Sequence, residues 1–530
     1  MTLHQHVQAG PTRDQELEEL VSLIKSISLE KLRIPEGTSK PVHLARDDAD
    51  DSLRRLQQFL EDFSGQSLEQ GGFADAVSLL SQSSINNSSP GFLGKLVSSP
   101  SPPGIASDLL LSLLNNNGHV WRASPALTLV EQHVSKSLAG LFGLDGPNAG
   151  GFTVPGGAAA NMLALLVARN ILSPESKTQG VTPGRYAVFV SDAAHYSVSN
   201  AAQIVGLGQD AVVRIPTLKN ETMDVDFLEA AIETAIQRGR TPLFINATAG
   251  NTVNGMFDAI DRIGPIARKA NAWYHIDACW GGAVAFSDNL RHLIKGSELA
   301  DSIAFNPHKM LGVPLTCAFL LARDLRYFWV ANKLSAGYLF HDDKSATADR
   351  KRNDESARDK AHLDWRSSAL LDEAPSVFDI RDMASLTGQC SRRSDATKMF
   401  LHWVYYGTAH IARDVEQAVA SARHLAKLVH ENEHLELLGD IDEVFAQVCF
   451  YWTPTADIGV SSSGARNSTV NTKNTHLLYE QITEEGWKID YAPWKERGDC
   501  IRIACNRTTS RATVEEFVLR LIQLGKSLGL

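Results

Sequence analysis

The sequence predicts an α/β protein built on a mostly parallel β-sheet. Between about residues 106 and 330, short apolar runs typical of buried strands alternate with helical segments. Continuous apolar runs joined by helices favour a sheet that helices cover on both faces. The strand-like runs lie at 186–190, 242–249, 272–278, 302–306 and 317–322, and helical segments such as 226–239 and 260–270 separate several of them.

The segments on either side of this central part have a different character. Residues 14–63 carry Leu, Val and Ile at helical spacing among charges. Residues 81–104 are rich in Ser, Pro and Gly, which predicts either a flexible tether or, because the stretch contains the apolar letters FLGKLV, an anchored loop. Residues 342–360 include 12 charged residues among 19 and predict a solvated excursion.

From about residue 395 onward, amphipathic helices and a few strands indicate a smaller α+β domain. We therefore predict three parts. They are an N-terminal helical segment with a linker at 1–105, a large domain at 106–395, and a small C-terminal domain at 396–530.

Composition excludes several classes of function. The net charge of −10 and the lack of Lys/Arg clusters argue against a nucleic-acid surface. The longest apolar stretches are far shorter than a membrane span needs, and the N-terminus lacks the apolar core of a secretory signal. Six cysteines without CxxC spacing predict reduced thiols and a cytoplasmic protein.

A lysine follows one of the predicted strands. Residues 305–311 read FNPHKML, and the proline ends the strand because it cannot continue a central ladder. Lys309 therefore lies just past a strand end, at the edge where open α/β sheets bind ligands.

Three further features fall at strand ends of the same sheet. Asp277 ends the strand in YHIDACWGG, and His195 follows the strand at 186–190. The letters PGG precede an apolar helix that starts near Gly157, where exposed backbone N–H groups suit a phosphate. Each feature alone is common in structural roles: strand-end lysines are usually solvated, and PGG is a frequent turn.

Together these residues match the needs of pyridoxal 5'-phosphate. Its aldehyde forms a Schiff base with a lysine, its pyridine nitrogen needs an acidic partner, and its phosphate suits a helix N-terminus. A flat imidazole such as that of His195 can cover the face of the ring. No metal is needed for this chemistry.

The motifs NPHKM, HIDACWGG, PGGAAAN, AAHYS and NATAGNTVNGMFD resemble those of the group II pyridoxal-phosphate-dependent amino-acid decarboxylases, in the same order and spacing. The likeness runs from about residue 88 to the C-terminus and is strongest to the glutamate and cysteine-sulfinate decarboxylase branch. It implies a fold-type I, aspartate-aminotransferase-like architecture with a large sheet domain and a small C-terminal α+β domain. It also implies a homodimer with the active site at its interface.

The resemblance implies a role for each matching residue. Lys309 would hold the cofactor, Asp277 would pair with the ring nitrogen, and His195 would stack on the ring. The remaining cofactor-binding positions would surround the phosphate and the ring hydroxyl; these are Gly157, Ala158, Thr248, Asn306 and His308.

Substrate residues are suggested by positions where the branches of the family differ. Lys95, near Phe92 in SSPGFLGKL, aligns with a glutamine that contacts substrate in the glutamate branch. Arg502 matches an arginine that holds the distal carboxylate in that branch, although similar arginines occur in the aromatic branch.

We expect α-decarboxylation of a small acidic L-amino acid, namely glutamate, aspartate or cysteine sulfinate. An aromatic amino acid is the alternative, because residues 116–131 resemble the aromatic and diamino-acid branches.

A loop tyrosine of the family, which helps to protonate the substrate carbanion, aligns with Phe378. Phenylalanine has no proton to give, so this alignment predicts a share of aldehyde product, as in a decarboxylating aldehyde synthase. The alternative is that the longer loop shifts the register and that another group, such as His362, serves.

The letters HENEH at 430–434 offer a remote alternative. They match the H-E-x-x-H signature of zinc metallohydrolases, in which His430 and His434 would bind the metal from one face of a helix. The context is a polar helix end, and spacing places no third ligand.

Overall fold

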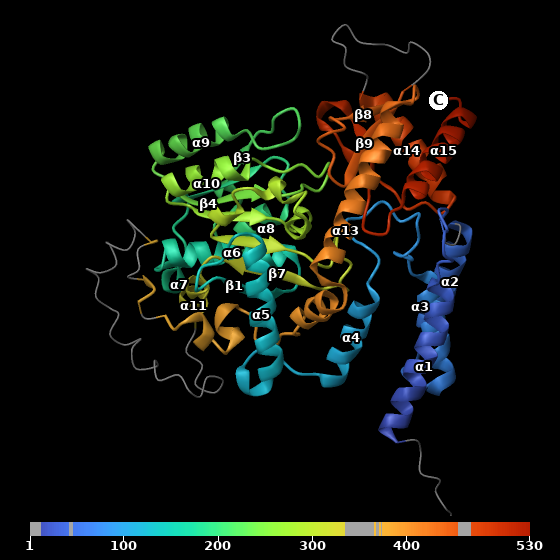
Figure 1. Cartoon of the computed structure of the whole chain (residues 1–530), viewed down its shortest axis with the longest axis horizontal. Coiled ribbons are helices and arrows are strands. Elements are labelled where there is room, and N and C mark those ends of the chain that lie inside the picture. The colour runs from blue at the N-terminus through green and yellow to red at the C-terminus, as the bar shows by residue number, and fades with distance from the viewer. Residues whose placement is uncertain (1–11, 42–45, 334–364, 367–369, 373, 454–467) are drawn as a thin grey trace, which may run out of the picture. The chain divides into compact units, whose positions relative to one another are not determined.

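A seven-stranded sheet organises the part of the chain that carries the predicted site (Figure 1). The computed structural model describes residues 12–41, 46–333, 365–366, 370–372, 374–453 and 468–530. The strand order is β1-β7-β6-β5-β4-β2-β3. The strands are β1 (Gly150–Val154), β2 (Tyr186–Ser191), β3 (Val212–Ile215), β4 (Thr241–Thr248), β5 (Trp273–Asp277), β6 (Ser302–Phe305) and β7 (Ala318–Ala322).

The sheet is mostly parallel, as predicted. Strands β3, β2, β4, β5 and β6 run parallel, whereas β7 is antiparallel to both β6 and β1. Every apolar run expected to be a strand forms one. The pattern misses β1, because its letters GGFTV begin with two glycines, which lack the side chains that signal a strand.

Alternate residues of each strand enter two different cores, one on each face of the sheet. In β2, Ala187 and Phe189 belong to one core, and Val188 and Val190 to the other. The first core is covered by α5 (Pro125–Leu141), α9 (Val225–Gln237), α10 (Ile260–Lys269) and α13 (Ala396–His430). The second is covered by α6 (Gly157–Leu172), α8 (Ser197–Ile204) and α11 (Arg326–Asn332).

The described residues form two compact units. We call Leu96–Tyr451 with Arg502–Thr509 the central unit, and Met1–Lys95 with Trp452–Ile501 and Ser510–Leu530 the terminal unit. Residues from 396 onward contribute to both, and the three-part division drawn from composition stays a prediction. No described helix is both long and apolar enough to cross a membrane.

The other elements complete this outline. The terminal unit contains α1 (Arg13–Leu32), α2 (Arg46–Asp62), α3 (Glu69–Ser83), α14 (Ser468–Glu484) and α15 (Arg511–Ser527). The central unit also contains α4 (Pro102–Leu114) and the short α7 (Ser176–Gln179). A four-stranded sheet has the order β10 (Asp490–Pro493), β11 (Asp499–Ala504), β9 (Gln447–Trp452) and β8 (Leu435–Leu438).

The serine-rich stretch is an anchored loop, so the flexible-tether interpretation of it is wrong. In the central unit its residues Ser98 and Ser101 are buried. Ser101 caps α4 by accepting a hydrogen bond from the Gly104 backbone. Prolines occupy the first turn of α4, where a missing N–H costs nothing.

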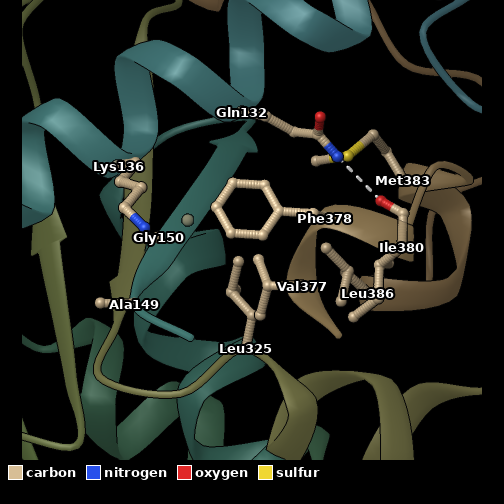
Figure 2. Close-up of a pocket in the computed structure, with 11 residues that line it drawn as sticks. Gln132, Lys136, Ala149, Gly150, Leu325, Val377, Phe378, Ile380, Met383 and Leu386 are labelled. Atoms are coloured by element: carbon tan, nitrogen blue, oxygen red, sulfur yellow. Dashed lines mark hydrogen bonds between the residues drawn. The ribbon is translucent and has the colours of Figure 1, made fainter. Parts of the chain in front are cut away.

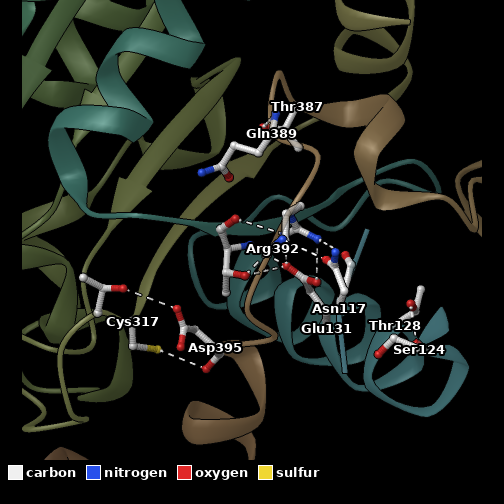
Figure 3. A network of polar contacts seen from close by, with 12 residues as sticks. Asn117, Ser124, Thr128, Glu131, Cys317, Thr387, Gln389, Arg392 and Asp395 are labelled. Atoms are coloured by element: carbon white, nitrogen blue, oxygen red, sulfur yellow. Dashed lines mark hydrogen bonds and ion pairs between the residues drawn. The ribbon is translucent and has the colours of Figure 1, made fainter. Parts of the chain in front are cut away.

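A buried ion pair fastens the chain after residue 388 to α5 and β1 (Figure 3). Arg392 Nη2 lies 2.6 Å from Glu131 Oε1, and both side chains are almost fully buried. Glu131 also accepts hydrogen bonds from the backbone and hydroxyl of Thr153 in β1, and Arg392 Nη1 donates to the carbonyl of Gly118. Breaking such a pair by removing one partner costs about 3–5 kcal/mol, because a buried charge is left uncompensated.

Candidate active site

A cavity of about 210 Å³ lies where β2, β4, β5 and β6 end. Its lining brings together all the cofactor-binding positions expected from the sequence, which are Gly157, Ala158, His195, Thr248, Asp277, Asn306, His308 and Lys309. These positions come from segments far apart in the chain. They meet because the carboxyl ends of parallel strands share one edge of a sheet.

Asp277 is a buried carboxylate at the end of β5. Its Oδ2 accepts a hydrogen bond from Asn161 Nδ2 at 2.8 Å, and its Oδ1 accepts one from the Cys279 backbone at 3.1 Å. Burial by itself raises the pKa of Asp277, but the positive charge of Lys309 and these hydrogen bonds outweigh it and hold the pKa below its usual value. The side chain is therefore an anion at neutral pH, although it is only 7% exposed.

His195 follows β2 and enters the cavity from the turn before α8. Burial lowers its pKa, the carboxylate of Asp277 acts against that shift, and the charge of Lys309 adds to it. The imidazole is therefore neutral at pH 7. Its Nδ1 lies 2.8 Å from Ser197 Oγ.

The loop that carries Lys309 is fastened by the serine-rich stretch. The Ser98 backbone donates to the carbonyl of Lys309 at 2.9 Å, and Ser98 Oγ donates to the carbonyl of Met310 at 2.7 Å. The Ser101 backbone donates to the carbonyl of Gly312 at 2.8 Å. These bonds hold the backbone of Lys309 in place and leave its side chain to the cavity.

The N-terminus of α6 reaches the cavity through two glycines. Gly156 precedes the helix with φ at 103°, a conformation that favours glycine. At Gly157 a Cβ would lie 2.4 Å from Cys279 Sγ and 2.9 Å from Asn306 Nδ2, so only glycine fits there. The first N–H groups of a helix lack partners within the helix, which makes this end suited to a phosphate.

Two polar side chains in the cavity wall indicate that a ligand binds there. Within the described part of the chain, Thr248 Oγ1 and Asn306 Oδ1 are buried and have no hydrogen-bond partner. Buried polar groups are nearly always paired, so orphaned atoms facing a cavity indicate a polar molecule that completes them. A buried anion, a lysine, a neutral imidazole, a helix N-terminus and these orphaned atoms fit pyridoxal phosphate.

The predicted substrate residues have different surroundings. Arg502 in β11 is buried, and its Nη1 donates to the carbonyl of Thr252, a residue that lines the cavity. Lys95 pairs with Asp490 at 2.8 Å, and Phe92 is buried in the terminal unit. Arg502, Lys95 and Phe92 are not among the residues that line the cavity, and their assignment to substrate binding stays a prediction.

The structure does not bring Phe378 to the cavity that contains Lys309. Its ring is 66% exposed and lies over a small apolar cavity lined by Val377, Ile380 and Leu325, with the Lys136 amine 4.9 Å from the ring centre (Figure 2). A role for Phe378 in protonation stays a prediction, and the alternative His362 lies outside the described residues.

The H-E-x-x-H letters do not form a zinc site on a helix. α13 ends at His430, and Glu431 already caps it, so His434 lies beyond the helix. The two histidines therefore do not share a helical face. Among the described residues, no group of three or more His, Cys, Asp and Glu side chains is placed to hold a metal ion.

Several lining residues were not predicted. They include Asn161, Ser197, Gly250, Thr252, Cys279 and Trp280. The sequence could have indicated Asn161 as a lining residue, because it lies one helical turn after Gly157 and therefore on the same face of the helix. His275 does not line the cavity but contacts Asn161, and the sequence could have indicated it because it lies on the same face of β5 as Asp277.

Comparison with known proteins agrees with this site. Residues 66–354 match the model of the pyridoxal-dependent decarboxylase conserved domain. The chain therefore belongs to the family of pyridoxal-phosphate-dependent amino-acid decarboxylases, and the expected family, cofactor and reaction type are confirmed.

Individual relatives share nearly the whole length of the chain. A glutamate decarboxylase-like protein of Gibberella zeae is 56% identical, over 98% of this chain and 99% of its own. An L-aspartate decarboxylase of Metarhizium robertsii is 34% identical, over 97% and 98% respectively. The crystal structure of mouse cysteine sulfinic acid decarboxylase in its apo form superposes with a TM-score of 0.81 at 26% identity, and covers 96% of this chain and 99% of that one. The predicted fold-type I architecture is thereby confirmed.

The tight contact at Gly157 gives a testable prediction. We expect Gly157→Ala to weaken binding of pyridoxal phosphate about tenfold or more, because the added Cβ displaces Cys279 and Asn306 from the cavity wall. Fluorescence titration of the apoprotein with the cofactor measures this affinity. The matched control is Gly140→Ala in α5, where a Cβ meets open space and a helical alanine is favourable. Equal cofactor affinity in the two variants would contradict the assignment.

Proposed function

We propose that this decarboxylase removes the α-carboxylate of a small acidic L-amino acid, with glutamate, aspartate and cysteine sulfinate as the candidates. The observation that carries the substrate class is Arg502, a buried cation that contacts the wall of the cavity at Thr252. The names of the relatives support the same class, because they act on aspartate or cysteine sulfinate or resemble a glutamate enzyme.

Each cavity residue would have its own role in the reaction. When bound, pyridoxal phosphate supplies an aldehyde that takes up the amino acid and a cationic ring that accepts the electrons of the broken Cα–carboxylate bond. Lys309 would hold that aldehyde, and the anion of Asp277 would keep a proton on the ring nitrogen. His195 would cover the ring face, and Thr248 Oγ1 would bond the ring hydroxyl.

The groups of the described residues that would hold the phosphate end are neutral. Gly157 and Ala158 offer backbone N–H groups at the start of α6, and Asn306 offers an amide. His308 adds an imidazole whose pKa burial lowers to about 4, so this ring is neutral at pH 7.

The active protein would be a homodimer, as the family resemblance implies. Several of the exposed apolar side chains of the central unit lie on α4, α5 and α13, and α13 packs against each of the other two helices. They are Ile105, Leu109, Leu110, Leu113, Leu114, Leu129, Val404 and Tyr405, and we call them the apolar face. Exposed apolar side chains that gather on neighbouring helices are typical of association surfaces. A second copy of the chain is the occupant that the family predicts.

Location in the cytosol is part of the same proposal. All six cysteines are free thiols, and five of them are buried. Reduced thiols are typical of proteins in a reducing compartment.

The substrate proposal predicts a pattern of activities. The purified holoenzyme should release carbon dioxide from at least one of glutamate, aspartate and cysteine sulfinate, and much more slowly from tyrosine and tryptophan. Lys309→Ala should lose the visible absorption of the bound cofactor together with turnover, because no other lysine of the described residues lines the cavity. Preference for an aromatic substrate would overturn the acidic assignment and favour the aromatic alternative.

Arg502 can be tested separately. Arg502→Ala should raise KM for the acidic substrate about 10- to 100-fold, because a charge-assisted hydrogen bond is worth roughly 1.5–3 kcal/mol. KM for a slow aromatic substrate should change little, which separates lost charge recognition from general damage to the loop at Thr252. An equal rise for both substrates would assign Arg502 to holding the loop alone.

The dimer proposal predicts a change of mass. The wild-type protein should sediment with twice the mass of one chain, and Leu109→Asp with Leu113→Asp should shift it toward the monomer, since burying two carboxylates without partners is costly. The control is Leu519→Asp, an exposed leucine of α15 outside the apolar face. A double variant that stays dimeric would place the interface elsewhere.

A further inference from the structure

Asn161 connects two of the side chains that face the cofactor site. It lies in α6, it is 1% exposed, and all hydrogen-bonding groups of its amide are engaged. Its Nδ2 donates to Asp277 Oδ2 at 2.8 Å and to Ser197 Oγ at 2.9 Å. Its Oδ1 lies 3.0 Å from His275 Nε2.

The charge of Asp277 decides which way this amide points. A reversed amide would set its oxygen against the carboxylate, so Oδ1 must face His275, and His275 Nε2 must carry a hydrogen. Burial lowers the pKa of His275 to about 4, so the ring is neutral and its Nδ1 accepts. The donor is Ser302 Oγ at 2.8 Å, which itself accepts from Trp273 Nε1 at 2.8 Å.

The second branch of the amide runs to His195. Ser197 Oγ accepts from Asn161, and it lies 2.8 Å from His195 Nδ1. The backbone N–H of Ser197 also points at this nitrogen, at 3.3 Å. Nδ1 is therefore the acceptor, the Ser197 hydroxyl donates to it, and the hydrogen of the neutral imidazole stays on Nε2.

We propose that Asn161 is a positioning residue for the cofactor: it holds Asp277 as an anion and, through Ser197, keeps the hydrogen of His195 on Nε2. The chain of donors runs in one direction from Trp273 through Ser302, His275 and Asn161, and then divides to the two cofactor-facing side chains. This inference rests on the proposed cofactor site. An amide suits the junction because it offers donors and an acceptor together and does not titrate.

The first test compares two buried asparagines of the same helix. Asn161→Leu keeps the branched shape and the number of side-chain heavy atoms but removes every hydrogen bond of the junction. Asn170→Leu is the matched control, because Asn170 is also buried in α6 but donates to the carbonyl of Ala331 and does not line the cavity. We expect Asn161→Leu to weaken pyridoxal phosphate binding about tenfold. Asn170→Leu should stay within about twofold of the wild type.

A second measurement follows the protonation of His195 directly in the apoprotein. Exchange of the imidazole C2 hydrogen, followed by mass spectrometry of the peptide that contains His195, gives its titration midpoint. In Asn161→Leu the Ser197 hydroxyl is released and can accept from a protonated Nδ1, so the midpoint should rise by about one pH unit. Asn170→Leu should leave the midpoint unchanged.

Asn161→Asp adds a pH-dependent signature that a purely structural role would not give. Its carboxyl would face Asp277 and His275, with His195, Lys309 and Cys279 around the same cavity. Two adjacent carboxyl groups share one proton, which raises the pKa of the pair, and the introduced carboxyl, once protonated, can donate to Asp277 again. Cofactor affinity should therefore recover toward the wild-type value as pH falls from about 8 to about 6, whereas Asn161→Leu should stay weak throughout.

Ser197→Ala separates the branches. It should move the His195 midpoint but weaken cofactor binding less than Asn161→Leu does, since the bond from Asn161 to Asp277 remains. If Asn161→Leu behaves like Asn170→Leu, or if Asn161→Asp follows the wild-type pH dependence, the inference is wrong. If Asn161→Leu does not fold, the Asn161→Asp and Ser197→Ala results decide. Retained cofactor absorption in Lys309→Ala would instead overturn the proposed site itself.

Discussion

The arrangement around the cavity depends on one buried carboxylate that must keep its negative charge. Asp277 is almost fully enclosed at the end of β5, where burial alone favours the neutral acid. The anion persists because a cation and well-placed N–H groups surround it. If Asp277 were protonated, its carboxyl would no longer require the N–H groups of the Asn161 amide to face it, and the amide would no longer require the hydrogen of His275 to lie on Nε2.

The sheet edge supplies the precision that this carboxylate needs. β5 and β6 are neighbours, so Asp277 and the Lys309 loop leave the sheet side by side, and α6 brings its N-terminus against both. The close approach at Gly157, where even a Cβ would overlap Cys279, sets the width of the cavity. A strand end carries Asp277, a helix end carries Gly157, and a loop fastened by hydrogen bonds carries Lys309, so supported backbone sets the geometry of the cavity.

Contacts from outside the sheet hold the loops that the strands leave unsupported. Ser98 fastens the backbone of Lys309, although the letters around Ser98 suggest a tether. The buried pair of Arg392 and Glu131 fastens a distant segment to β1. Buried charges and buried serines are costly without partners, and here each has them, so these loops gain specificity of position as well as stability.

The sequence by itself determined the class of fold, and it predicted the lysine, carboxylate and histidine that the structure brings to one cavity. Strand periodicity and strand-end residues are local properties, and parallel topology then forces strand ends together. Tertiary structure alone decided the partners of those residues. Asn161, Ser197 and His275 become a junction only through contacts between α6, α8 and β5, which no local pattern encodes. The place of Phe378 against Lys136, and the break between His430 and His434, also depend on packing and helix termination, so matching letters could not settle them.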